Sequence, residues 1–242
     1  MSGHSKWSQI KHKKTVTDAK RGQLFSKMVK EITVAARSGG TSAETNPRLR
    51  QALERAKFAG LPKENRERAV LKASGGEEGT LLQEFLYEAT YPGGIMILVK
   101  GVSDNKNRTL AEIKHLLGGH GAKLANPDSL VWNFDKTGVI AIALGDNHHM
   151  KSDELELSII EAGAREFKKT NTALLVEVDF EKREGVRKKL EEWGVKIKES
   201  YYDYKPRAQI NLPEKERKVA EGLLGAISDH NDVQGVYTNL KE

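Results

Sequence analysis

Residues 138–205 read GVIAIALGDNHHMKSDELELSIIEAGAREFKKTNTALLVEVDFEKREGVRKKLEEWGVKIKESYYDYK, and this stretch decides the fold class. Short apolar runs typical of strands alternate with segments whose apolar residues recur at helical spacing. The predicted order is strand, helix, strand, strand, helix, strand, over Val139–Leu144, Ser152–Ala162, Arg165–Lys169, Ala173–Val178, Glu181–Trp193 and Lys196–Tyr204. This is the ferredoxin-like βαββαβ arrangement.

The segments on either side of this stretch are also mixed. Between residues 81 and 134 the patterns predict three strands and a helix. The strands are indicated by alternation at Phe85, Tyr87 and Ala89, by the apolar run Ile95–Val99, and by alternation at Leu130, Trp132 and Phe134. The helix is capped by Ser103-Asp104 and ends at Gly118-Gly119. A helix over Pro213–Ser228 and a strand over Val233–Tyr237 follow the ferredoxin-like stretch. One helix and one strand cannot form a core alone, so we expect them to complete the sheet of residues 81–134.

The N-terminal third is predicted to be helical. A first helix starts at Asp18 and ends at Gly39-Gly40, and a second starts at Pro47 after the cap Asn46 and runs to about Phe58. A third opens at Pro62 and continues through Leu71, before a glycine-rich linker at residues 75–79. Residues 2–17 form a basic arm ahead of these helices.

These patterns together predict an α+β protein of three domains. A basic helical domain with its arm covers residues 1–79. A discontinuous α/β domain covers residues 80–135 and 206–242, and the βαββαβ domain of residues 136–205 is inserted in it.

Charge is distributed unequally along the 242 residues. Residues 1–80 contain 17 Lys and Arg against 8 Asp and Glu, a net charge of +9, whereas the remaining 162 residues have a net charge of −3. A basic segment joined to a mildly acidic remainder indicates a polyanionic partner for one end of the chain. The alternative is a solvated basic surface that has no partner.

Several classes of protein are disfavoured by the same sequence. There is no cysteine, which excludes disulfides, thiolate metal sites and cysteine nucleophiles. No apolar run approaches the roughly 20 residues of a membrane-spanning helix, and Met1–Ile10 does not resemble a secretory signal, so we expect a cytoplasmic protein. No P-loop, nucleophile elbow or HExxH spacing occurs, and His148-His149 lie in a polar loop. We therefore expect no enzymatic activity, no metal, no cofactor and no small-molecule substrate.

The informative residues are basic or polar groups that can contact phosphate. Trp7 can stack on a base, although a hydrophobic anchor for the arm explains it at least as well. The helix start at Asn105–Thr109 can hold a phosphate on its amides and on Arg108, or it is an ordinary capped turn. The candidate nucleic-acid-binding residues are Lys6, Trp7, Lys11, His12, Lys13, Lys14, Lys20, Arg21, Lys27, Arg48, Asn107 and Arg108.

Motifs in order along the whole chain resemble the YebC family, which includes mitochondrial translational activators. The chain starts Met1-Ser2-Gly3-His4-Ser5-Lys6-Trp7, and the further matching motifs are Lys11-His12-Lys13, Phe25-Ser26-Lys27 with Glu31-Ile32, Asn46-Pro47-Arg48-Leu49-Arg50, Pro92-Gly93-Gly94, Asp104-Asn105-Lys106-Asn107-Arg108-Thr109, Asp232-Val233-Gln234 and Val236-Tyr237-Thr238-Asn239. The resemblance implies a helical domain and two α/β domains, the third inserted in the second. His148-His149-Met150 is not typical of the family.

The resemblance also implies a function. Bacterial members are commonly labelled probable DNA-binding transcriptional regulators, whereas mitochondrial relatives act in translation and bacterial members are linked to ribosomes that translate proline runs. We therefore expect a partner that is DNA, or ribosomal or messenger RNA with the ribosome. The sequence does not separate the two, because phosphate contacts carry no information about the sugar or base. Residues 18–72 contain no recognisable reading helix, and residues 138–205 lack the aromatic RNP signature of RNA-binding domains.

Overall fold

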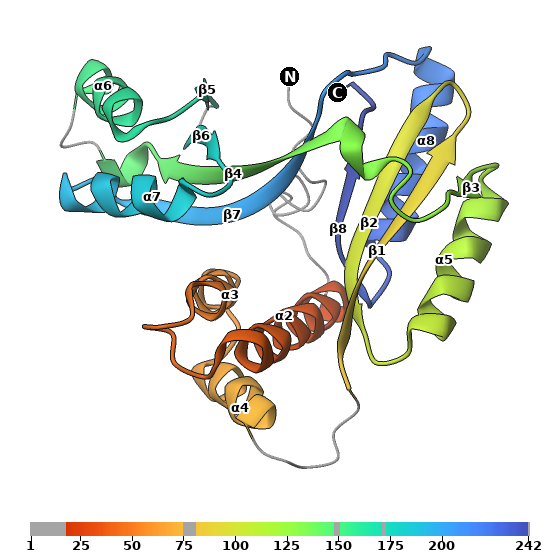
Figure 1. Cartoon of the computed structure of the whole chain (residues 1–242), viewed down its shortest axis with the longest axis horizontal. Helices are drawn as coiled ribbons and strands as arrows, with labels where there is room; N and C mark the ends of the chain where they lie inside the picture. Colours follow the sequence, from red (N-terminus) through yellow and green to blue (C-terminus); the bar gives the residue numbers. More distant parts are fainter. Residues whose placement is uncertain (1–17, 75–80, 148–150, 171–172, 242) are drawn as a thin grey trace. The chain divides into compact units, whose positions relative to one another are not determined.

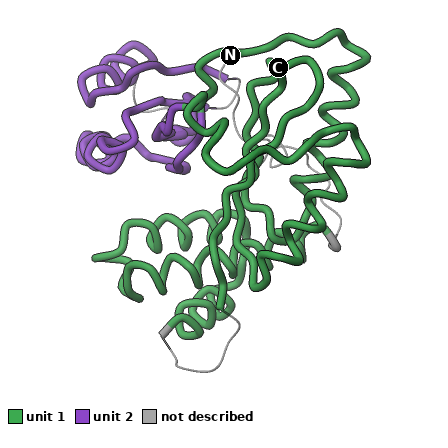
Figure 2. The backbone as a smooth tube through the Cα atoms, turned by 45° about the vertical axis from the view of Figure 1, so that its right-hand side comes forward, with its two compact units in different colours: residues 1–134, 205–242 green, residues 135–204 purple. Residues whose placement is uncertain are grey.

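The computed structural model describes residues 18–74, 81–147, 151–170 and 173–241. The chain divides into two compact units (Figure 2). The first comprises residues 1–134 and 205–242, and the second comprises residues 135–204. The second unit is therefore inserted in the sequence of the first. Across the described residues, no helix is both long and apolar enough to cross a membrane.

Three helices form the N-terminal part of the first unit: α2 (Asp18–Gly39), α3 (Pro47–Phe58) and α4 (Lys63–Ser74) (Figure 1). Their apolar faces share one core, whose members recur at steps of three and four residues, as an amphipathic helix requires. Ile32, Leu49 and Ala56 in this core are fully buried. The predicted cap is also present, because the Asn46 side chain accepts a hydrogen bond from Leu49 N at 3.0 Å.

A four-stranded sheet follows in the same unit, in the order β3-β1-β2-β8. Its strands are β1 (Gln83–Tyr91), β2 (Ile95–Ser103), β3 (Lys123–Leu124) and β8 (Val233–Thr238), and each pairs antiparallel with its neighbours. Helices α5 (Lys106–Gly119) and α8 (Glu214–Ser228) supply the other half of the core. Strand β8 pairs with β2, with Tyr237 opposite Leu98. The prediction that the last helix and strand complete this sheet is therefore confirmed.

The second unit has its own sheet and core. In chain order it contains β4 (Phe134–Ala143), α6 (Ser152–Ala162), β5 (Glu166–Lys169), β6 (Ala173–Asp179), α7 (Arg183–Glu192) and β7 (Ile197–Pro206). The strand order β5-β6-β4-β7 is that of a ferredoxin-like fold, and Ile140, Leu174 and Ile159 are fully buried between sheet and helices. The α+β class predicted from the sequence is confirmed.

Three local details differ from the prediction. The alternation at Leu130, Trp132 and Phe134 does not form a separate strand, because Phe134 is the first residue of β4, which begins before the predicted start at Val139. Instead Val131–Asn133 form a 3₁₀ turn, in which the Trp132 indole donates to Ser129 O at 2.7 Å while most of its ring faces solvent. The cap of α5 is Asn105 rather than Ser103-Asp104. The two-residue strand β3 was not predicted, because two residues are too few to show a period.

The chain leaves and re-enters the first unit at neighbouring points. Arg207 N donates to Asn133 O at 2.9 Å, so the residues that precede β4 and follow β7 are hydrogen-bonded to each other. The buried carboxylate of Glu88 in β1 holds the loop just before this point, because it accepts hydrogen bonds from Asp128 N at 2.7 Å and Val131 N at 3.1 Å, and another from Leu130 N.

Candidate nucleic-acid interface

Half of the predicted nucleic-acid-binding residues fall in the basic arm. Those six lie outside the described residues: Lys6, Trp7, Lys11, His12, Lys13 and Lys14. The other six lie on helices of the first unit, with Lys20, Arg21 and Lys27 in α2, Arg48 in α3, and Asn107 and Arg108 in α5. Their surroundings differ in ways that bear on phosphate binding.

Lys27, one of the candidate nucleic-acid-binding residues, is buried and not exposed on the helix surface. Its side chain is 4% exposed, and Nζ donates to Ser228 O at 2.7 Å, at the end of α8. In the other direction, Gln234 Nε2 donates to Lys27 O at 3.0 Å. Burial lowers the pKa of Lys27 from 10.5 to about 8, an effect that the nearby Asp229 partly offsets. Lys27 therefore holds α2 against α8 and β8 and does not present its ammonium to a ligand.

The carboxylate of Asp232 is the centre of a second contact between α2 and the sheet. It is 1% exposed and accepts hydrogen bonds from Thr109 Oγ1 at 2.6 Å, from Arg108 Nη2 at 3.0 Å and from Lys30 Nζ. Burial disfavours the ionised form, but these donors outweigh it and hold the pKa of Asp232 well below its usual range. The carboxylate therefore stays ionised between two cations from different helices.

A glycine allows the loop that carries Asp232 to lie close to β2. Val102 N donates to Asp232 O at 2.8 Å, next to an irregularity in the β2–β8 register at Lys100 and Gly101. A Cβ atom at Gly101 would lie 2.1 Å from Asp232 O, so only glycine fits there. The position of the Asp232 carboxylate thus depends on β2 as well as on α2 and α5.

The predicted phosphate site at the start of α5 is filled by the protein's own acids. Arg108 donates to Asp104 Oδ1 at 2.6 Å as well as to Asp232, and these contacts raise the pKa of its guanidinium. Arg108 N is used by the Asn105 cap at 3.0 Å. Asn107 is exposed on the same turn. The capped-turn interpretation therefore describes this helix start, and Arg108 would have to exchange a carboxylate for a phosphate.

Arg48 and Lys20 are also beside acids. Arg48 forms a two-pronged ion pair with Glu84 at the start of β1, with one contact at 2.9 Å, and this pairing lowers the pKa of Glu84 even though its burial acts in the opposite direction. Lys20 Nζ lies 3.7 Å from Asp229, and both side chains are more than half exposed. Such an exposed pair is weak, so Lys20 stays available to a phosphate, as does the exposed Arg21.

Three potential metal ligands, Glu112, His230 and Asp232, lie within 4.8 Å of one another, but other contacts already occupy them. His230 Nε2 is 2.8 Å from Glu112 Oε2, and His230 Nδ1 accepts from Asp232 N at 3.1 Å. The Asp232 carboxylate has its three donors. We therefore assign no cation to this cluster.

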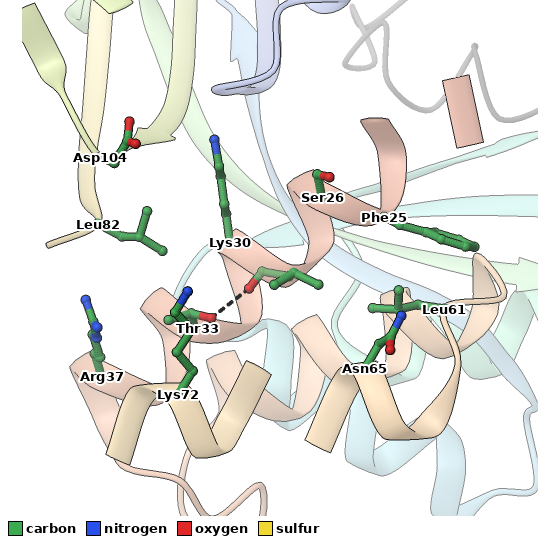
Figure 3. A pocket seen from close by; sticks show the side chains of 11 residues that line it. Phe25, Ser26, Lys30, Thr33, Arg37, Leu61, Asn65, Lys72, Leu82 and Asp104 are labelled. Atoms are coloured by element: carbon green, nitrogen blue, oxygen red, sulfur yellow. Dashed lines mark hydrogen bonds between the residues drawn. The ribbon is translucent and has the colours of Figure 1, made fainter. Parts of the chain in front are cut away.

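A cavity of about 420 Å³ runs beside α2 (Figure 3). One wall is a face of α2 that includes Phe25, Lys30 and Arg37, and the facing wall includes Leu61 and Lys72 from the α3–α4 connection and α4. We call this cavity the α2 groove. Leu82 and Asp104, from the sheet side of the unit, complete it. Its lining contains three cations and one carboxylate, so it is positively charged.

The residues that matter most in this region are not among the candidates chosen from the sequence. Lys30, Arg37 and Lys72 are all absent from that set. Asp232 appeared only within a family motif. No local pattern could have found the Lys30–Asp232 pair, because the two residues are 202 positions apart.

Comparisons with known proteins identify the same family in both parts of the chain. A family model described as "TACO1/YebC protein N-terminal domain" matches residues 5–76, and one described as "TACO1/YebC second and third domain" matches residues 82–240. A "Probable transcriptional regulatory protein" of Halothermothrix orenii is 42% identical over 242 residues, covering 99% of this chain and 95% of that protein. A protein of the same name from Thermotoga maritima is 40% identical over 241 residues, covering 100% of this chain and 94% of that protein.

A solved structure is also similar over nearly the full length. The crystal structure of a conserved hypothetical protein from Aquifex aeolicus has a TM-score of 0.87 and 37% sequence identity. The match covers 98% of this chain and 97% of that chain. The fold is therefore shared from end to end.

Proposed function

Because the chain belongs to the TACO1/YebC family, we propose that it is a non-enzymatic, nucleic-acid-binding regulator of gene expression, of the DNA-binding transcriptional type. The names of its relatives support the regulatory role. The nucleic-acid partner rests on one observation, the net charge of +9 in residues 1–80 against −3 in the rest of the chain. The cytoplasmic location expected from the sequence is part of this proposal.

The contacts of the helical region support a leading role for the arm. Lys27 is buried, and Arg48 and Arg108 each pair with a carboxylate. These cations would have to lose a protein contact in order to gain a phosphate contact. Lysines 11, 13 and 14 belong to a segment with no acid before Asp18, so we assign the main phosphate contacts to them.

The test is a charge reversal in the full-length protein, Lys11→Glu with Lys13→Glu and Lys14→Glu. We expect affinity for duplex DNA and for single-stranded RNA to fall at least tenfold, and the dependence of log K on log salt to flatten. Fluorescence anisotropy over a series of salt concentrations measures both quantities.

A matched control reverses three exposed lysines of the second unit, Lys168, Lys188 and Lys189, and thus changes net charge by the same amount. We expect this control to retain most of the affinity and the original salt slope. Equal effects in the two triple variants, or an arm variant that binds like the wild type, would contradict the role of the arm.

A translational role is the second candidate, favoured by one feature of the second unit. The rings of Phe180 and Tyr202 are in contact, with centroids 4.3 Å apart and planes tilted by 33°, and each residue is about 40% exposed. The Arg183 guanidinium lies 4.0 Å from the centre of the Tyr202 ring. Exposed aromatic rings beside an arginine are a platform on which unstacked RNA bases bind. In this candidate function the protein would be an RNA- or ribosome-binding translational activator for difficult sequences such as proline runs.

Crosslinking in cells, followed by sequencing of the bound DNA and RNA, separates the two candidates. Enrichment of promoter DNA supports the transcriptional role. Enrichment of ribosomal or messenger RNA supports the translational role, and we then expect a Tyr202→Ala variant to reduce that enrichment.

A further inference from the structure

We propose that the α2 groove binds a single strand of nucleic acid, with a backbone phosphate at Arg37 and Lys72 and a base at Phe25. This inference deepens the proposed function and rests on it, because it assigns part of the nucleic acid to a site on the helices rather than to the arm. Three properties of the groove carry it: an arginine nitrogen without a hydrogen-bond partner among the described residues, a cluster of positive charge at one end, and a shape that extends to an aromatic side chain at the other.

The first property concerns the Arg37 guanidinium. Its Nη1 atom is buried and has no hydrogen-bond partner among the described residues. A buried donor without an acceptor is costly, and such groups are rare unless a ligand or a water completes them. Arginine prefers phosphate oxygens, which accept hydrogen bonds from its planar fork. The open donor of Arg37 therefore fits a phosphate in the groove.

The second property is the charge near Arg37. Lys72, on α4, lines the same end of the groove as Arg37, whereas Phe25, Leu61 and Asn65 lie toward the other end (Figure 3). Both helices thus contribute a cation to one place.

The other charges of the groove are already neutralised. Lys30 is paired with Asp232, and Asp104 is paired with Arg108 at 2.6 Å. Among the described residues, the uncompensated charge of the groove is therefore positive and lies at the Arg37–Lys72 end.

The third property is the shape of the groove. Phe25 and Arg37 are twelve residues apart on α2, a separation of about 18 Å along the helix axis. A single phosphate or a mononucleotide would fill only one end of such a groove, whereas a strand would contact both. Phe25 is half-buried and offers a face on which a base can stack, and Leu61 gives that end an apolar wall.

The test is the double variant Arg37→Gln with Lys72→Gln in the full-length protein, which removes two charges and retains the side-chain stems. We expect the affinity for a 12-nucleotide single strand, measured by fluorescence anisotropy, to fall about tenfold or more. The slope of log K against log salt should become shallower by about 0.7, since one lost phosphate contact on a single strand contributes about 0.7.

The matched control is Lys57→Gln with Arg68→Gln, which removes one lysine and one arginine from exposed positions of α3 and α4 that do not line the groove. It should leave the slope unchanged and lower the affinity less than twofold. Equal losses in the two double variants, with both folded by thermal melting, would overturn the groove site.

Two further measurements complete the test. Phe25→Leu should weaken binding without changing the salt slope, because stacking is not electrostatic, and wild-type affinity in this variant would overturn the assignment of a base to that end. Inorganic phosphate and a mononucleotide, each at the same phosphate concentration as the strand, should not displace it. Displacement would overturn the strand in favour of a free phosphate.

The failures of the two proposals are distinguishable. A wild-type protein that binds no nucleic acid overturns the proposed function and the groove with it. A wild-type protein that binds, and loses affinity only in the arm variant, overturns the groove alone.

Discussion

Lys27 is buried although it carries an ammonium group, and this has a consequence for stability. Its pKa is about 8 in the folded protein, and it returns to an ordinary value near 10.5 on unfolding. Between these two pH values the unfolded chain binds more protons than the folded one, so stability rises with pH. Below pH 8, burial of the charged Lys27 ammonium lowers the free energy of unfolding by its full amount. Above pH 10.5, Lys27 is neutral in both states and this destabilisation is absent.

We therefore expect a Lys27→Met variant to lose part of this pH dependence. The wild-type free energy of unfolding should gain about 3 kcal/mol from Lys27 between pH 8 and 10.5, since one pKa unit corresponds to about 1.4 kcal/mol. Urea unfolding at several pH values measures the difference, with the exposed Lys57→Met as control. Parallel stability curves for wild type and Lys27→Met would contradict the prediction.

At the residue scale, the sequence predicted which side chains face the core better than it predicted which atoms the polar side chains contact. It correctly indicated which positions of α2 face a core, such as Ile32 and Ala35. It made Lys27 a candidate for phosphate binding, because a lysine next to apolar neighbours has the same pattern whether its ammonium contacts water or a carbonyl. The Ser228 carbonyl that receives it is 201 positions away.

Among the elements, the turn between α2 and α3 depends on one amide side chain. Asn46 Oδ1 accepts from Leu49 N, while Nδ2 donates to Ala35 O and to Gly40 O, each at 2.7 Å. The residue is 4% exposed, so a lost partner is not replaced by water. This side chain both starts α3 and closes the end of α2.

We expect Asn46→Ala to lower the free energy of unfolding by about 2 kcal/mol, because it removes a cap and the two hydrogen bonds that the buried amide donates to Ala35 O and Gly40 O. Asn46→Ser keeps an acceptor for the cap and should lose roughly half as much. The exposed Asn107→Ala is the control, with a change within about 0.5 kcal/mol. Chemical denaturation measures all three, and an Asn46→Ala variant as stable as the control would be inconsistent with the double role.

The bounds of helices α2 and α3 could be predicted from the sequence, because caps and breakers such as Asn46 and Gly39-Gly40 act locally. The alternation around Trp132 was misleading for a physical reason. An exposed turn near a sheet can show the same alternation as a strand, and here the indole of Trp132 finds its acceptor, Ser129 O, three residues away. Only the tertiary context separates the two.

For the whole molecule, the hydrogen bond between Arg207 N and Asn133 O leads to a prediction about the insertion. We propose that residues 135–204 form a separable domain, since Ile140, Leu174 and Ile159 belong to a core of their own. A variant in which two or three glycines replace residues 135–204, and so connect Phe134 to Lys205, should be soluble. Its unfolding, followed by circular dichroism, should be cooperative. The excised segment, expressed alone, should also fold. An aggregated product in both experiments would contradict the nested arrangement.

More of the topology than of the candidate site could be predicted from the sequence. A lone helix and strand at the end of the sequence had to join an earlier sheet, and β8 does so. The candidate site depends instead on pairs such as Lys30 with Asp232 and on the approach of α4 to α2. These contacts follow from packing rather than from any period in the sequence.

The pairing of β2 with β8 also affects the chain while it is being synthesised. Strand β2 is apolar and mostly buried, and β8 begins 130 residues after β2 ends. At typical elongation rates of about 5–20 residues per second, one edge of β2 waits roughly 7–26 seconds for its partner. The inserted unit is complete before β8 is made and can fold during that delay. An unpaired apolar edge is open to other chains, so the nested topology makes the yield of soluble protein depend on how fast translation delivers the last strand.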